Sequence, residues 1–265
     1  MQATFKKLSA EQAARYKTEG YILYHRQVFA KPKLHRLRTL FEEKIANLKP
    51  DERPEQMDVP HFVDTRLFEW IFADEVLDIV EDVIGPDIDL FSTHLIAKPA
   101  GGSMRVPWHE DSSYWRDWID PMEVVTVWLA LDGSDEENGC MYVIPRSHDK
   151  GFSEYYSVDP NKNLFMTEIR KGQFDETKAV PLILAEGEAS LHHAKLIHGS
   201  QANSSKRRRM GYTMRYISSA TRLNPDNPAK QQVYHARGKD HGVNRYADPS
   251  RTYPELLVGR MTKGH

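Results

Sequence analysis

The residues with the clearest chemical potential are two histidines and one aspartate, His109, Asp111 and His198. In an extended segment, residues two apart project to the same face, so His109 and Asp111 could reach one ion together. His198 would then approach that ion from a distant strand. Two imidazoles and one carboxylate on one face of a divalent ion form the ligand set that suits non-haem Fe(II) in oxygenases. They leave the remaining positions open for a co-substrate and O₂.

The third ligand has two competitors in the same region, His192 and His193. Residues five apart in a strand face opposite sides, so His193 and His198 would share an ion only if a turn at Ala194 and Lys195 separates them. His198 ends an apolar stretch and is the preferred ligand, while His193 is expected to line the pocket.

A run of four cations ends at Arg209 and offers several partners for an anion. Strand phase chooses among them, because a strand with Gly211 and Thr213 facing inward also turns Arg209 inward and Arg208 outward. Arg209 could then bind the far carboxylate of a dicarboxylate co-substrate through two parallel hydrogen bonds. Arg215 lies on the same face, where a buried charge needs an anion, either an acidic substrate or a structural partner.

Composition sets limits on the class of protein. The chain has 265 residues, 40% of them hydrophobic, which is enough for one large core. Its net charge of −2 lacks the basic excess of a nucleic-acid-binding protein. Cys140 is the single cysteine, so neither an intrachain disulfide nor a thiolate metal cage is expected. The chain has no apolar signal region and no long apolar run, so a soluble, cytoplasmic protein without a membrane partner is expected.

The pattern of elements changes along the chain. Residues 1–88 are expected to be mainly helical, with Ser9 capping a helix that ends at Gly20 and Asp74 capping another. After Pro86, short β-type runs alternate with turn residues, which is typical of a sandwich or barrel. Strands are expected at residues 21–24, 90–97, 124–131, 141–144, 180–184, 190–193 and 210–217.

No repeat or linker divides the chain, so a single domain over residues 1–265 is expected. Its β core would span about residues 89–220. The segment 153–176 is polar and irregular, which is typical of an insertion over one mouth of the core. Residues 221–265 show little periodicity and are expected to form an extended tail or lid.

Four segments carry a resemblance to a known family. They are WHEDSSYW at 108–115, TVWLALD at 126–132, EENGCMYVIPRSH at 136–148, and HGSQANSS at 198–205 followed by Arg209. Together they resemble the phytanoyl-CoA dioxygenase family of Fe(II)- and 2-oxoglutarate-dependent oxygenases, over about residues 8–220. This resemblance implies a mainly β protein with flanking helices around a double-stranded β-helix, the jelly-roll or cupin-like core.

The resemblance also implies residue roles. It implies His109, Asp111 and His198 as iron ligands and Arg209 as the partner of the distal carboxylate of 2-oxoglutarate. Further co-substrate candidates are Ser200, which would assist Arg209, Trp115 and Trp128, which would wall the site, and Lys98. Halogenating members of the family have a small residue where Asp111 stands, so hydroxylation is expected here.

The substrate is expected to be a small organic molecule, polar or anionic, because tryptophans and cations surround the ligand candidates. The residues expected to contact it are His94, Tyr114, Trp118, His193 and Arg215. Two other functions use the same triad. A cupin-like metal-dependent hydrolase or isomerase would need no Arg209, and a non-catalytic metal-binding module would show no turnover. The sequence indicates neither the substrate's identity nor the oligomeric state.

Overall fold

Two antiparallel sheets face each other in the computed structural model, which describes residues 6–258. The main sheet contains, in order, β1 (Tyr21–Tyr24), β11 (Ala189–His193), β6 (Val124–Ala130), β13 (Arg209–Ser218), β3 (Ile88–Lys98) and β15 (Tyr234–Arg237), with β2 (Met57–Asp58) also paired to β3. The second sheet contains β10 (Val180–Pro181), β7 (Met141–Val143), β12 (His198–Ser200) and β4 (Val106–His109). The mainly β class with a jelly-roll core is confirmed.

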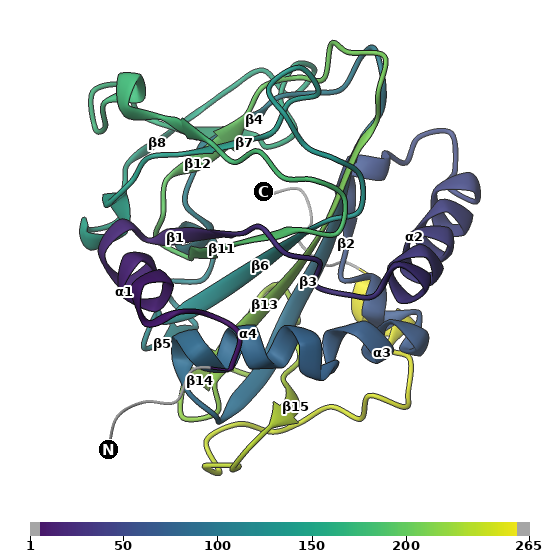
Figure 1. Ribbon diagram of the computed structural model, residues 1–265, viewed down its shortest axis with the longest axis vertical. Helices are drawn as coiled ribbons and strands as arrows, with labels where there is room; N and C mark the ends of the chain where they lie inside the picture. The colour runs from purple at the N-terminus through teal and green to yellow at the C-terminus, as the bar shows by residue number, and fades with distance from the viewer. Residues whose placement is uncertain (1–5, 259–265) are drawn as a thin grey trace.

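Four helices cover the outer face of the main sheet. They are α1 (Ala10–Glu19), α2 (Lys31–Ala46), α3 (Phe68–Ile71) and α4 (Asp74–Ile84). Figure 1 shows α3 and α4 along one side of the main sheet, with β4, β7 and β12 beyond its other side. Two small ribbons complete the fold, β8 (Tyr155–Ser157) with β9 (Thr167–Ile169), and β5 (Ile119–Asp120) with β14 (Arg222–Leu223).

The two faces of strand β6 have different neighbours, and this difference places the site between the sheets. All seven of its residues are buried, and successive side chains point to opposite faces. Val125, Val127 and Leu129 belong to the large apolar cluster that includes the helices. Trp128 and Ala130 belong to a separate cluster with residues of the second sheet. One face of the main sheet therefore packs under helices, and the other faces the second sheet and the pocket.

The helix ends show which cap predictions hold. Ser9 caps α1 through a reciprocal capping box with Gln12, and the helix ends at Gly20 with φ of 81°, as expected. The prediction for Asp74 is wrong, because Ala73 is the N-cap of α4 and Asp74 is the first helical residue. The Asp74 carboxylate contacts Arg237 of β15 instead of the helix backbone.

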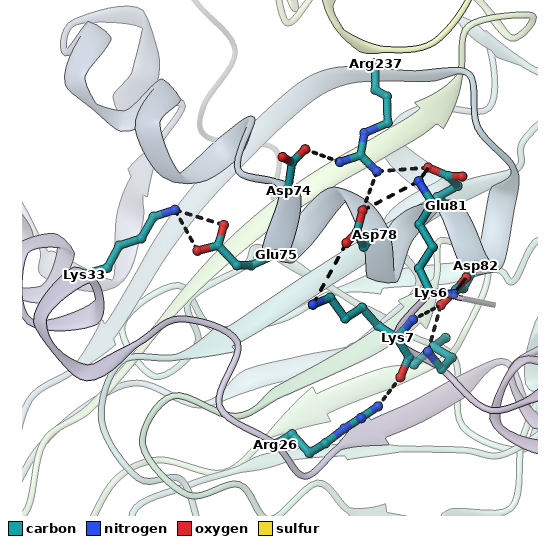
Figure 2. Close-up of polar contacts among 11 residues, drawn as sticks. Lys6, Lys7, Arg26, Lys33, Asp74, Glu75, Asp78, Glu81, Asp82 and Arg237 are labelled. Atoms are coloured by element: carbon teal, nitrogen blue, oxygen red, sulfur yellow. Dashed lines mark hydrogen bonds and ion pairs between the residues drawn. The ribbon is translucent and has the colours of Figure 1, made fainter.

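The acidic face of α4 binds residues 6–8 near the start of the chain and Arg237 of β15, as Figure 2 shows. The Asp82 carboxylate accepts hydrogen bonds from the backbone N–H groups of Lys6, Lys7 and Leu8 at 2.7–2.8 Å. Arg237 donates to Asp78 and Glu81 at 2.8 and 2.9 Å. This helix thus anchors the start of the described chain and the last strand of the main sheet.

Several segments differ from the sequence-based expectation. The segment 153–176, expected to be irregular, contains the β8–β9 ribbon. The run 180–184 forms a strand only at Val180–Pro181, because Leu184 pairs with Ser134 in an isolated bridge instead. Residues 222–258 contribute β14 and β15, and β15 pairs with β3 at the sheet edge. No helix among residues 6–258 is long and apolar enough to cross a membrane.

Candidate metal centre and adjoining pocket

His109 and His198 are brought together by the second sheet. They lie opposite each other on β4 and β12, with ring centroids 4.1 Å apart. Each Nδ1 lies 2.8 Å from the backbone carbonyl two residues earlier, that of Pro107 or Leu196. Because a carbonyl only accepts, both Nδ1 atoms carry the proton, and both Nε2 atoms keep a lone pair for a metal.

Asp111 reaches the same point just beyond the end of β4. The strand ends at His109, Glu110 keeps an extended backbone, and Asp111 opens a 3₁₀ helix over Asp111–Tyr114. The turn is fixed because the Ser112 N–H donates to the Ala194 carbonyl at 3.0 Å. The Asp111 Oδ1 atom lies 3.8 Å from His109 Nε2. The prediction that His109 and Asp111 project to the same side is therefore confirmed, although β4 itself ends at His109.

The donor set fits a divalent metal. One ligand atom from each of His109, Asp111 and His198 lies within 4.8 Å of the others, and all three residues are buried. Burial alone would raise the pKa of Asp111, but Arg215 and the neighbouring histidines hold it well below its usual range. Burial lowers the pKa of His198 well below its usual range. Asp111 is thus an ionised carboxylate and His198 a neutral imidazole, which are the protonation states in which these side chains bind metals.

A second charged region lies at the start of β13. Arg209 pairs in register with Lys98 of β3, and its guanidinium stacks over Trp128 with 5.3 Å to the ring centroid. Burial lowers the pKa of Arg209 to about 10. Its Nε has no hydrogen-bond partner among residues 6–258, and no carboxylate there forms an ion pair with it. An anion would satisfy this buried cation.

Lys98 adds a buried amine beside the Arg209 guanidinium. Its Nζ donates to the Gln201 carbonyl. Burial, and then the Arg209 charge, lower the pKa of Lys98 well below its usual range. Lys98, a co-substrate candidate from the sequence, thus lies beside Arg209 on the adjacent strand but is not among the residues that line the pocket.

The strand-phase prediction for β13 is confirmed. Arg209, Thr213 and Arg215 all line the pocket. Arg208 faces the other way and donates to Asp132 at 2.7 Å. The full lining consists of His94, Ile96, Val106, His109, Asp111, Trp128, Met141, Phe165, His192, His198, Gly199, Ser200, Arg209, Thr213 and Arg215.

Other sequence candidates lie in different places. Ser200, Trp128 and His94 line the pocket, and His94 contacts the Glu55 carbonyl through Nε2 at 3.2 Å. Trp115, expected beside the co-substrate, instead lies under Arg215 with 5.2 Å to its ring centroid.

Three substrate candidates do not line the pocket. Trp118 belongs to an apolar cluster with Trp115, and Tyr114 lies behind His109 with ring centroids 6.5 Å apart. His193 points to the opposite face of β11, where its Nε2 lies 3.4 Å from the Glu123 carboxylate. The reason is the alternation of side chains along the strand.

Among the pocket residues that were not predicted from the sequence as substrate or co-substrate contacts, His192 and Phe165 lie against the metal-ligand candidates. His192 lines the pocket in place of His193, and Phe165 packs edge-on against His109 with centroids 4.8 Å apart. The register of β11 against β6 could have identified His192, because it shares a face with Trp128. Nothing local marks Phe165, which reaches the site from the loop between β8 and β9.

Fold and site together define a jelly-roll protein with a candidate metal-binding triad and a buried cationic side chain, Arg209, in the same pocket. The phytanoyl-CoA dioxygenase (PhyH) family matches residues 7–211, and the chain belongs to this family. It is 31% identical over 150 residues to phytanoyl-CoA dioxygenase domain-containing protein 1 of Danio rerio, covering 55% of this chain and 50% of that one. The chain thus matches about half the length of this curated relative.

Solved structures show the same fold. The apo form of the non-heme monooxygenase ThoJ superposes with a TM-score of 0.75 at 22% identity, covering 95% of each chain. EvdO2 from Micromonospora carbonacea var. aurantiaca, in complex with 2-oxoglutarate, superposes with a TM-score of 0.67 at 19% identity, covering 84% of this chain and 96% of that one.

Proposed function

We propose that this protein is a non-haem Fe(II)- and 2-oxoglutarate-dependent dioxygenase that hydroxylates an aliphatic C–H bond of a small organic substrate. The main support for this proposal is the buried triad of His109, Asp111 and His198, whose ligand atoms lie within 4.8 Å of one another. Two imidazoles and one carboxylate on one side of an ion are the ligand set of non-haem Fe(II) oxygenases. Membership of the phytanoyl-CoA dioxygenase family supports this choice.

The co-substrate would lie between the triad and Arg209. The unpaired guanidinium of Arg209, with the Lys98 amine beside it, would hold the distal carboxylate of 2-oxoglutarate, and Ser200 lies on the same pocket wall. Trp128 would keep Arg209 in place through its stacked ring. When bound, the iron and 2-oxoglutarate supply the oxidation: with O₂, a C–H bond becomes C–OH while 2-oxoglutarate becomes succinate and CO₂.

The chain's own residues would position the reactants and exclude water. The carbonyl-bound Nδ1 atoms of His109 and His198 fix the rings in their ligating orientation. Phe165 packs edge-on against the His109 ring in the pocket wall, where its apolar ring would help to exclude water. Asp111 would be a metal ligand where halogenating members of the family have a small residue, which favours hydroxylation over halogenation.

The experiment is anaerobic addition of Fe(II) and 2-oxoglutarate, followed by exposure to O₂. We expect a weak visible charge-transfer band before O₂ and succinate release afterwards, with a substrate library to identify the hydroxylated product. Arg209→Gln should lose most 2-oxoglutarate affinity. The matched control is Arg208→Gln, which removes an arginine bound to Asp132 away from the pocket.

The outcomes separate the competing functions. A cupin-like hydrolase or isomerase would turn over without 2-oxoglutarate and would be indifferent to Arg209→Gln. A non-catalytic module would bind metal without producing succinate. If Arg209→Gln and Arg208→Gln release succinate at the same rate as the unmodified protein, Arg209 is not the co-substrate ligand.

A further inference from the structure

A row of polar side chains crosses the main sheet next to the metal-ligand candidates. His192 of β11 is opposite Thr126 of β6, Thr126 is opposite Arg215 of β13, and Arg215 is opposite Ser92 of β3. Directly opposed residues in a sheet project to the same face. These four residues, called here the polar row, therefore share the pocket face of the sheet.

The polar row is buried, and part of its hydrogen-bonding capacity is unused. His192 is 2% exposed and Thr126 is fully buried. Both ring nitrogens of His192 and the Thr126 hydroxyl have no hydrogen-bond partner within residues 6–258. The Asp111 Oδ2 atom lies 3.9 Å from His192 Nε2, which is beyond hydrogen-bonding distance. Buried polar groups are nearly always paired, so this cluster points to a polar ligand.

Arg215 uses two of its three guanidinium nitrogens in hydrogen bonds within residues 6–258. Its Nε donates to Asp111 Oδ2 at 3.3 Å, and its Nη1 donates to Ser92 Oγ at 3.5 Å. In the described part of the chain, its Nη2 makes no hydrogen bond. The ion pair with Asp111 accounts for one side of the guanidinium, and the other remains available within the pocket that Arg215 lines.

Strand β13 places two arginines in the pocket, far apart along the strand. Arg209 and Arg215 are six residues apart on one strand face, with Gly211 and Thr213 between them. At the usual rise per residue this separation is about 20 Å. The proposed co-substrate uses the Arg209 end, while Asp111 places the metal ligands next to Arg215. The Arg215 end is therefore the side left for the substrate.

We propose that the polar row binds a carboxylate of the substrate, so that the protein oxidises a small organic carboxylate. This inference rests on the proposed function and names its substrate class. Arg215 Nη2, a ring N–H of His192 and the Thr126 hydroxyl would donate to the carboxylate oxygens. Phe165 and Val106 of the facing wall would contact the carbon chain.

Charge balance supports an anion over a neutral group. A divalent ion, the Asp111 carboxylate, the inner carboxylate of 2-oxoglutarate and the Arg215 guanidinium together leave one positive charge in a buried site. Buried charges are stable only when they are paired. A substrate carboxylate on the polar row would supply the missing negative charge, whereas an alcohol or amide would not.

The test uses butanoate, hexanoate and octanoate, each compared with its primary amide, which has nearly the same shape without the charge. Binding is followed in the anaerobic protein loaded with Fe(II) and 2-oxoglutarate, by change in the visible charge-transfer band and by tryptophan fluorescence. We expect at least one carboxylate to bind about tenfold or more tightly than its amide, the factor expected for a charge-assisted hydrogen bond. Arg215→Met should abolish that preference.

Two further variants guard against a folding defect. His192→Phe keeps a ring of similar size and should weaken carboxylate binding more than amide binding. Arg208→Met removes an arginine–carboxylate pair elsewhere on the same chain segment and should retain the full preference. The thermal midpoint of each variant is measured alongside.

These measurements test the oxygenase function and the carboxylate-binding role of the polar row separately. Absence of the charge-transfer band refutes the proposed function. If the band forms, three results would overturn the assignment of the polar row: equal affinity for carboxylates and amides, retention of the preference in Arg215→Met, or no response to any probe, which would mean that water alone satisfies the row.

Discussion

Gly211 offers the most direct test of the pocket geometry. A Cβ atom at this position would lie 2.0 Å from Trp128 Cζ2 and 2.3 Å from Cε2. Ordinary contact begins at 3.4 Å, so in Gly211→Ala the indole must move by about 1.4 Å. The ring cannot stay under Arg209, because its stacked position is the one that the new methyl group occupies.

The size of the effect follows from overpacking. Forcing one extra carbon into a packed core costs about 1–3 kcal/mol. For a chain of this length, that range corresponds to a thermal midpoint lower by roughly 2–12 °C. The displaced indole also enters the space proposed for 2-oxoglutarate, so co-substrate affinity should fall by about tenfold or more.

The assay combines thermal unfolding with 2-oxoglutarate titration of the Fe(II) protein. Gly133→Ala is the matched control, because a Cβ there meets only the Leu184 carbonyl at 3.9 Å. The double variant Gly211→Ala with Trp128→Phe should recover part of the lost stability, since phenylalanine lacks the ring atoms that clash.

The geometry is refuted if Gly211→Ala and Gly133→Ala give the same thermal midpoint and the same 2-oxoglutarate affinity. It is also refuted if Trp128→Phe fails to recover any stability in the double variant. Loss of affinity without loss of stability would show that the indole moves freely, against the packed position described here.

Three further predictions concern other parts of the chain. Burial lowers the pKa of His235, but its contact with Asp89 at 2.9 Å outweighs this and raises it. Protonated His235 therefore stabilises the folded state fully at pH values below its unfolded-state pKa, and this stabilisation is lost as the pH rises through its folded-state pKa. In His235→Gln, the free energy of unfolding should no longer show this change with pH. Arg237→Met should lower the free energy of unfolding by about 1 kcal/mol and speed hydrogen exchange in β15, with exposed Arg222→Met as control. Phe165→Ala should open the pocket to water and raise 2-oxoglutarate consumption relative to product formed; an unchanged ratio would contradict its covering role.

Local patterns in the sequence determined much of the fold. The capping box at Ser9 and the alternation in β6 and β13 depend on residues a few positions apart, so they can be read without knowing the tertiary structure. The same alternation correctly separated the inward Arg209 from the outward Arg208. The triad residues could be named for the same reason, because their types and flanking segments are informative on their own.

Tertiary structure decided how those residues meet. Asp111 and His109 meet His198 because β4 pairs with β12, and the chain after Asp111 is held by the hydrogen bond from the Ser112 N–H to the Ala194 carbonyl. His192, and not His193, faces the pocket because β11 pairs with β6 in one register. Such pairings join segments many residues apart, and their energies depend on the whole packed sheet.

The two pocket arginines of β13 show the division most clearly. Sequence alone determined that Arg209 and Arg215 share a face, since that follows from strand alternation. Only the folded chain decided their partners: Lys98 and Trp128 at one end, Asp111 and Trp115 at the other. The physical reason is that a residue's type is local, whereas the charge and space around it are set by strands from elsewhere in the chain.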